Sequence, residues 1–193
     1  MDGAADIDLF IVTRGRHVWS VAVSVLLLSK LLGRRKDICF NFVVSDHRLE
    51  TVCRDLFSAN QLIHLKPLID DGVYRRLVTA NPCVSKFYPN FQYSPNGYAA
   101  LGRPGPVLTL VKRLLEQLLA PGPGRLLEFV SRRLYRGYLR TRKPTWATPE
   151  SVTMEDDCLK LHSRSHYDRV MRCFEEAIDE ALSGLSAESG EVK

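Results

Sequence analysis

The sequence lacks the long apolar run that a membrane-spanning helix needs. The longest candidate, residues 18–32, is interrupted by Ser20, Ser24, Ser29 and Lys30. As a helix it would extend only about 22 Å, which is short of the roughly 30 Å hydrocarbon core of a bilayer. Acidic residues also stand where a secretory signal would carry basic ones, namely Asp2, Asp6 and Asp8. We therefore expect neither a membrane span nor a signal peptide.

Cysteine is sparse, and its spacing does not predict a disulfide framework. The chain has five cysteines, an odd number without paired spacing: Cys39, Cys53, Cys83, Cys158 and Cys173. This usage favours a reducing compartment, so the sequence predicts a cytoplasmic protein.

Several catalytic signatures are also missing from the sequence. It has no Gly-x-Ser-x-Gly nucleophile elbow, no phosphate-binding loop of the Gly-Lys-Ser type, no Gly-x-Gly-x-x-Gly fingerprint and no internal repeat. With 193 residues, 45% hydrophobic and 25% charged, the composition is that of a globular protein with one core and a small appended module.

Two carboxylates lie at the start of a predicted buried strand. Asp6-Ile7-Asp8 runs directly into the apolar residues Leu9-Phe10-Ile11-Val12. Because alternate strand residues share a face, Asp6 and Asp8 are expected on one side, where they can hold a divalent metal. The alternative is that both are solvent-facing acids close to a chain terminus.

The following residues predict a strand–helix–strand unit. The apolar stretch 17–32 reads as a helix that ends at Gly33, and residues 38–44 read as a second strand. This order is typical of an α/β protein in which a helix covers one face of a sheet.

These residues resemble the nucleotidyltransferase superfamily of polymerase-beta-like proteins, and more narrowly a group of uncharacterised bacterial nucleotidyltransferase-domain proteins. The resemblance is carried by the segments 6–12, 74–77, 80–90 and 156–162. It implies an α/β (α+β) fold with a small mixed sheet covered by helices, followed by a helical C-terminal portion.

The resemblance also implies a reaction and a metal site. In the superfamily, an Asp-x-Asp strand and a third acid bind two Mg²⁺ ions, which position a nucleoside triphosphate so that an acceptor hydroxyl attacks the α-phosphate. Asp6 and Asp8 match the first two positions, and Asn41 occupies the third, where a neutral amide supplies no carboxylate base. Asp37 and Asp46 flank that strand as possible substitutes.

The family's Gly-Ser element, which meets the triphosphate, has no counterpart here because only five residues precede Asp6. Two interpretations stay open: an N-terminally incomplete nucleotidyltransferase core, or a relative that keeps the fold as a non-catalytic binding protein.

Proline and glycine punctuation divides the chain into four predicted parts. These are a core at 1–90, a linker at 91–106, a helical C-terminal region at 107–182 and a disordered tail at 183–193. In the last helix, the apolar positions Val170, Phe174, Ile178 and Leu182 predict docking on the core.

A basic helix at 125–143 suggests a nucleic-acid partner. Aromatic residues are interleaved with its basic residues, among them Arg132, Arg133, Arg136 and Arg140. The alternative is an amphipathic helix whose Leu134, Leu139 and aromatic residues face the core while the arginines face water.

Cys158, His162 and His166 are four residues apart and could present zinc ligands on one helix face. The favoured alternative is a short strand or turn at 159–162, followed by a helix that begins near Ser165.

Overall fold

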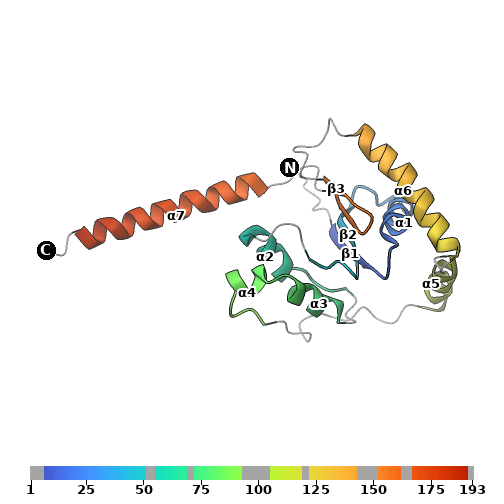
Figure 1. Cartoon of the computed structure of the whole chain (residues 1–193), viewed down its shortest axis with the longest axis horizontal. Coiled ribbons are helices and arrows are strands. Elements are labelled where there is room, and N and C mark those ends of the chain that lie inside the picture. The colour runs from blue at the N-terminus through green and yellow to red at the C-terminus, as the bar shows by residue number, and fades with distance from the viewer. Residues whose placement is uncertain are drawn as a thin grey trace.

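The first half of the sheet is a parallel strand pair, β1 (Ile7–Thr13) and β2 (Ile38–Ser45), joined by α1 (Val18–Leu31). The computed structural model (Figure 1) describes residues 7–50, 55–68, 72–92, 105–118, 122–142, 152–161 and 167–190. Gly33 follows the last turn of α1 with φ +66°, a left-handed conformation that favours glycine. The predicted strand–helix–strand unit is confirmed.

The second half of the sheet comes from the C-terminal region. β4 (Cys158–Leu161) pairs antiparallel with β2, and β3 (Val152–Met154) pairs antiparallel with β4, which gives the order β1-β2-β4-β3. The protein is therefore mixed α/β, with a four-stranded mixed sheet. The predicted helical region 107–182 thus also supplies two strands to the sheet that begins at residue 7.

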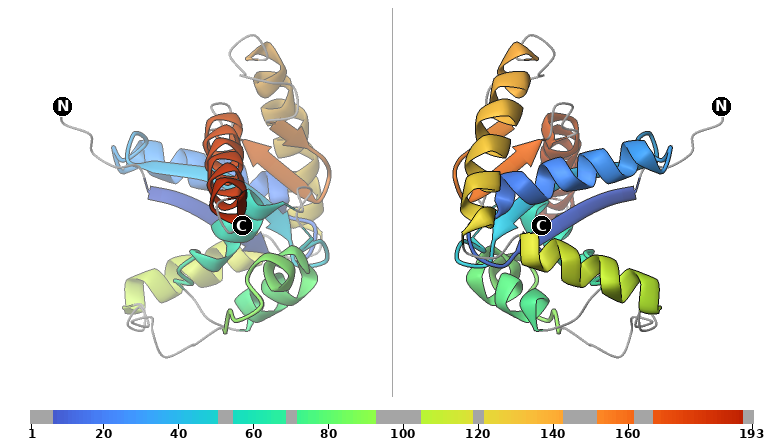
Figure 2. Two further views of the ribbon diagram at one scale, coloured as in Figure 1. Left: turned by 90° about the vertical axis from the view of Figure 1, so that its left-hand side faces the viewer. Right: turned by 90° about the vertical axis from the view of Figure 1, so that its right-hand side faces the viewer.

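One face of the sheet is covered by α1 and α6 (Pro123–Thr141), which lie against each other (Figure 2). The largest side chain of this layer is Trp19, which is fully buried and contacts the edge of the Tyr135 ring. The cluster that joins these two helices to the strands contains Val18, Trp19, Ala22, Phe40, Val43, Tyr135, Leu139 and Leu159.

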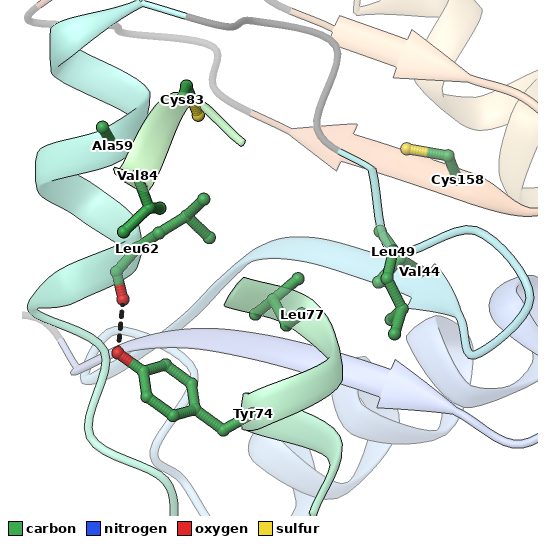
Figure 3. Close-up of a cluster of buried hydrophobic side chains, with 9 residues drawn as sticks. All are labelled: Val44, Leu49, Ala59, Leu62, Tyr74, Leu77, Cys83, Val84 and Cys158. Atoms are coloured by element: carbon green, nitrogen blue, oxygen red, sulfur yellow. Dashed lines mark hydrogen bonds between the residues drawn. The ribbon is translucent and has the colours of Figure 1, made fainter. Parts of the chain in front are cut away.

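The opposite face packs against three short helices, α2 (Leu56–Ile63), α3 (Val73–Ala80) and α4 (Cys83–Phe87). Figure 3 shows the buried side chains of this second cluster, which includes Val44 from β2 and Cys158 from β4. The Tyr74 hydroxyl, inside the cluster, donates a hydrogen bond to the Leu62 carbonyl at 2.8 Å. This hydrogen bond satisfies the Tyr74 hydroxyl, which would be costly to bury without a partner.

The remaining helices lie at the periphery. α5 (Pro106–Leu118) precedes α6, and α7 (Tyr167–Gly190) extends away from the rest of the molecule (Figure 1). The predicted docking of the last helix on the core is wrong, because Val170, Phe174, Ile178 and Leu182 are each 39–57% exposed. α7 also continues as helix into 183–190, where a disordered tail was predicted. Most of the predicted linker 91–106 lies outside the described residues.

No helix in the described part of the chain combines the length and the apolar character needed to cross a bilayer.

Candidate functional site at the start of β1

Asp8 lies near the beginning of β1, where the strand is still exposed to solvent. Phe10 and Val12 pack on the cluster below α2, α3 and α4, whereas Leu9 and Ile11 pack on the α1 side. Because strand side chains alternate, Asp8 shares the face of Phe10 and Val12. The helices α2, α3 and α4 cover this face of the sheet near the end of β1. The Asp8 carboxylate therefore lies at the uncovered end of the face, near the start of β1. Asp6, its predicted partner, lies outside the described residues.

Asn41 reaches Asp8 from the neighbouring strand because of a β-bulge. Leu9 pairs with Phe40 but Phe10 pairs with Phe42, so Asn41 is the extra residue of β2. The Asn41 Nδ2 amide donates a hydrogen bond to Asp8 Oδ1 at 2.7 Å, and its Oδ1 accepts one from the Cys39 thiol at 3.2 Å. The two residues matched to the family's second and third positions therefore lie in direct contact.

Lys160 adds a cation that the sequence analysis did not select. Its backbone pairs with Phe42 across β2 and β4, and its Nζ lies 5.9 Å from the centroid of the Phe42 ring. The Phe42 ring in turn stacks on Phe10 with centroids 5.3 Å apart. Since Cys158 packs below α2–α4 and Leu159 packs on the α1 side, Lys160 again belongs to the Asp8 face. Alternation along 158–161 was the signal that could have identified it, but only once the strand was known to join this sheet.

The two flanking acids do not take the third position. Asp37 is at the same end of the sheet as Asp8, but it is ion-paired with Arg34 at 3.0 Å. Asp46 follows the far end of β2, where its Oδ1 accepts a hydrogen bond from the Gly15 amide at 2.9 Å. That bond fixes the turn between β1 and α1. The whole length of β1, about 20 Å, separates Asp46 from Asp8.

The donor set at this site is small. Among the described residues, no three histidine, cysteine or acidic side chains gather closely enough to hold a metal ion. Asp8 and the Asn41 oxygen are too few to enclose a cation. Mg²⁺ usually keeps several waters and is bound through one or two carboxylates together with other oxygen ligands, so these two residues would hold it only as part of a larger ligand set.

The segment 80–90, which carried part of the family resemblance, has a structural role in the part of the chain described. The buried Asn81 side chain donates hydrogen bonds to the Leu49 and Leu77 carbonyls, at 2.8 and 2.7 Å. Cys83 and Val84 follow it into the core below the sheet. These residues therefore hold α3 and α4 against the chain that leaves β2.

The structure argues against Cys158 as the sulfur ligand of a zinc site. Cys158 is buried in the core on β4, and burial raises the pKa of its thiol, which disfavours the thiolate that a metal requires. His162 and His166 lie outside the described residues. The alternative of a short strand at this position is confirmed by β4.

The arginines of α6 divide into two groups. Arg132 is ion-paired with Asp156 at 2.5 Å and Arg136 is half-buried, whereas Arg133 and Arg140 are exposed. Leu139 and Tyr135 face the core, as in the amphipathic interpretation. The amphipathic interpretation is wrong for Leu134, Phe129 and Tyr138, which it placed against the core and which are 51–70% exposed.

Comparison with protein-family models, with curated proteins and with solved structures found no match.

Proposed function

We propose that this protein binds a nucleoside triphosphate with Mg²⁺ at the open end of the β1–β2 pair, as a nucleotidyltransferase-type domain that transfers a nucleoside monophosphate to an acceptor. The observation that carries the proposal is the exposed Asp8 carboxylate held at 2.7 Å by Asn41 on a parallel strand. The sequence resemblance at residues 6–12 supports the same assignment.

The roles follow from charge. Asp8, together with Asp6 two residues earlier on the chain, would hold the magnesium ion, whose positive charge offsets the charge of the phosphate oxygens. The Asn41 amide orients the Asp8 carboxylate by donating to one of its oxygens, which leaves the other oxygen open. The Lys160 ammonium, on the same face, would attract the phosphates.

Proton transfer sets a limit on this chemistry. An acceptor hydroxyl must lose a proton as it attacks the α-phosphate, and Asn41 cannot receive that proton. The proton then passes to water or to the phosphates themselves. We therefore expect slow transfer compared with a site that has a third carboxylate.

The proposal is tested by equilibrium binding of each of the four ribonucleoside triphosphates, with and without Mg²⁺. We expect binding that requires Mg²⁺ and that weakens at least tenfold in Asp8→Asn. Asp37→Asn is the matched control, because Asp37 is an acid at the same end of the sheet that is engaged by Arg34. Lys160→Gln should weaken binding of the triphosphate more than binding of the nucleoside.

Two outcomes would contradict the assignment. If no triphosphate binds in the presence of Mg²⁺, the chain is instead a non-catalytic protein with this fold. If Asp37→Asn weakens binding as much as Asp8→Asn does, the effect is one of general charge and the site is elsewhere. Because Asp8 is exposed, neither variant is expected to change the thermal unfolding temperature by more than a few degrees.

A further inference from the structure

Two helices expose apolar ridges of the same length and spacing. On α6 the ridge consists of Leu126, Val130, Leu134 and Tyr138, which are 41–70% exposed. On α7 it consists of Val170, Phe174, Ile178 and Leu182. Each ridge has four members at a spacing of four residues, and at about 1.5 Å per residue each extends about 18 Å. Rows of this kind are the ridges that pack into each other's grooves when two helices associate.

The charges beside the two ridges are of opposite sign. Arg133 is exposed next to the α6 ridge, and Arg142, also exposed, follows Tyr138 by four residues and lies over its ring. On α7, helical geometry of about 100° per residue places Glu175 and Asp179 next to the ridge, and both are exposed. Contact between the ridges would therefore bring cationic side chains of one helix against acidic side chains of the other.

The two helices of one chain are on opposite sides of the sheet. α6 packs on α1, whereas α7 contacts α2, which lies on the other face. Figure 1 shows α7 directed away from α6. A second copy of the chain could bring the two ridges together without moving α7 across the sheet.

We propose that the protein forms a homodimer in which the α7 ridge of each chain docks on the α6 ridge of the other. A two-fold axis makes the exchange reciprocal, so the same contact forms twice and closes the assembly. The eight ridge positions of each chain become buried, and the acidic and basic flanks pair at the rim. The inference is independent of nucleotide binding, because the Asp8 site involves neither helix.

The α6 surface suits a protein helix better than a nucleic acid. Arg132 and Arg136, two of the four arginines selected as phosphate contacts, are ion-paired and half-buried respectively. The ridge itself is mostly aliphatic, and aliphatic side chains do not provide the flat surface on which a base stacks. Nucleic acid is therefore treated as an outcome of the test.

The first experiment measures molar mass by light scattering coupled to size exclusion, over a hundredfold range of concentration. We expect twice the 21.9 kDa mass of one chain. Phe174→Asp with Ile178→Asp should give the monomer while far-ultraviolet circular dichroism remains that of a folded protein, because neither side chain belongs to the buried clusters of the core. Wild-type protein that is monomeric throughout, or a dimer that survives these substitutions, would overturn the proposal.

The second experiment exchanges the charges. Glu175→Arg with Asp179→Arg should raise the dimer dissociation constant at least tenfold, and so should Arg133→Glu with Arg142→Glu. In an equimolar mixture both contacts are complementary, because the reversed α7 of one protein meets the reversed α6 of the other and native α7 meets native α6. The mixture should therefore form a heterodimer more readily than either protein forms a homodimer. Glu176→Lys is the matched control, because Glu176 points away from the α7 ridge and should leave the dissociation constant unchanged.

Two results would assign the α6 surface to a different occupant. Failure of the mixture to associate preferentially would show that the flanking charges do not meet across an interface. A wild-type monomer that binds a single-stranded oligonucleotide, with an affinity unchanged in Phe174→Asp, would assign the surface to nucleic acid. Either result overturns the dimer proposal.

Discussion

Glu128 of α6 accepts hydrogen bonds from the backbone amides of Trp19 and Ser20 at the N-terminus of α1, at 2.9 and 2.8 Å. The Ser20 hydroxyl donates to the same carboxylate at 2.6 Å. α1 begins after His17, which provides no side-chain cap, and its first turn contains no acid. A carboxylate more than a hundred residues away in the chain therefore accepts hydrogen bonds from the first amides of this helix. Its negative charge also interacts favourably with the positive end of the helix dipole.

We predict that Glu128→Ala lowers the free energy of unfolding by about 2–3 kcal/mol, because it leaves amide donors without a partner in a half-buried position. Glu128→Gln keeps an acceptor but loses the charge, so a loss of about 1 kcal/mol is expected. Chemical denaturation measures both. Glu116→Gln on α5 is the control: Glu116 is ion-paired with the exposed Lys112, and its substitution should cost less than about 0.5 kcal/mol. Equal losses at Glu128 and Glu116 would rule out a capping role.

Local sequence signals were sufficient for several elements but not for contacts between distant ones. Strand alternation, the apolar stretch before Gly33 and the stop at that glycine predicted β1, α1 and β2. The predicted short strand or turn at 159–162 overlaps β4, which spans Cys158–Leu161. By contrast, no local pattern says that β4 pairs with β2, or that Glu128 caps α1. Those contacts depend on tertiary packing.

The dependence on tertiary packing also explains why the predicted core faces of α6 and α7 were wrong. Periodicity shows that a helix has an apolar face, but it does not identify what covers that face. Leu134 and Phe174 were therefore assigned to the core, and both are exposed. At the site, the sequence selected Asp8 and Asn41 together, whereas Lys160 becomes a neighbour only through antiparallel pairing with β2.

Stability at alkaline pH is predicted to depend on Tyr135. Burial in the layer between α6 and α1 raises the pKa of its phenol from 10.0 to about 12. Below pH 10 the phenol is neutral in both states, so it costs nothing. Between pH 10 and about 12 the unfolded state releases the proton while the folded state retains it, and stability falls.

The difference between these two pKa values corresponds to a loss of about 2–3 kcal/mol at most. Tyr135→Phe should remove this part of the alkaline decline, as measured by denaturant unfolding at a series of pH values from 8 to 12. Tyr138→Phe is the control, since Tyr138 is half-exposed on the same helix. A decline of the same size in Tyr135→Phe would assign the alkaline transition to other groups.

The stability of the turn between β3 and β4 is predicted to depend on Arg48. Its guanidinium contacts Glu155 and also lies 2.8 Å from Asp157 Oδ1, and these two hydrogen bonds hold the pKa of Arg48 above its usual value. Arg48 follows β2, so the ion pairs fix the hairpin against the central strand. Arg48→Ala should cost about 1 kcal/mol of unfolding free energy, because the pairs are partly exposed.

Amide hydrogen exchange gives a more local measurement of the same change. In Arg48→Ala, the amides of β3 and β4 should exchange faster, while those of α1 keep their protection. Arg34→Ala is the matched control, because it breaks one exposed ion pair with Asp37 far from the hairpin. Uniformly faster exchange throughout the chain would instead indicate global destabilisation.

The bulge at Asn41 allows the metal hypothesis to be tested by adding a ligand. Asn41→Asp replaces the amide that donates to Asp8 by a second carboxylate at hydrogen-bonding distance. Without a cation, two carboxylates this close repel each other, and one of them should bind a proton more tightly. We expect the variant to be less stable than wild type at pH 7 in the absence of metal.

Mg²⁺ should reverse that loss, because a cation between the two carboxylates removes their repulsion and gains a ligand. The melting temperature of Asn41→Asp is therefore expected to rise with Mg²⁺ concentration by several degrees, while that of wild type changes little. Asn41→Ala, which adds no charge, separates the metal effect from loss of the hydrogen bond. If Mg²⁺ affects Asn41→Asp and Asn41→Ala alike, the bulge does not place residue 41 where it can share a cation with Asp8.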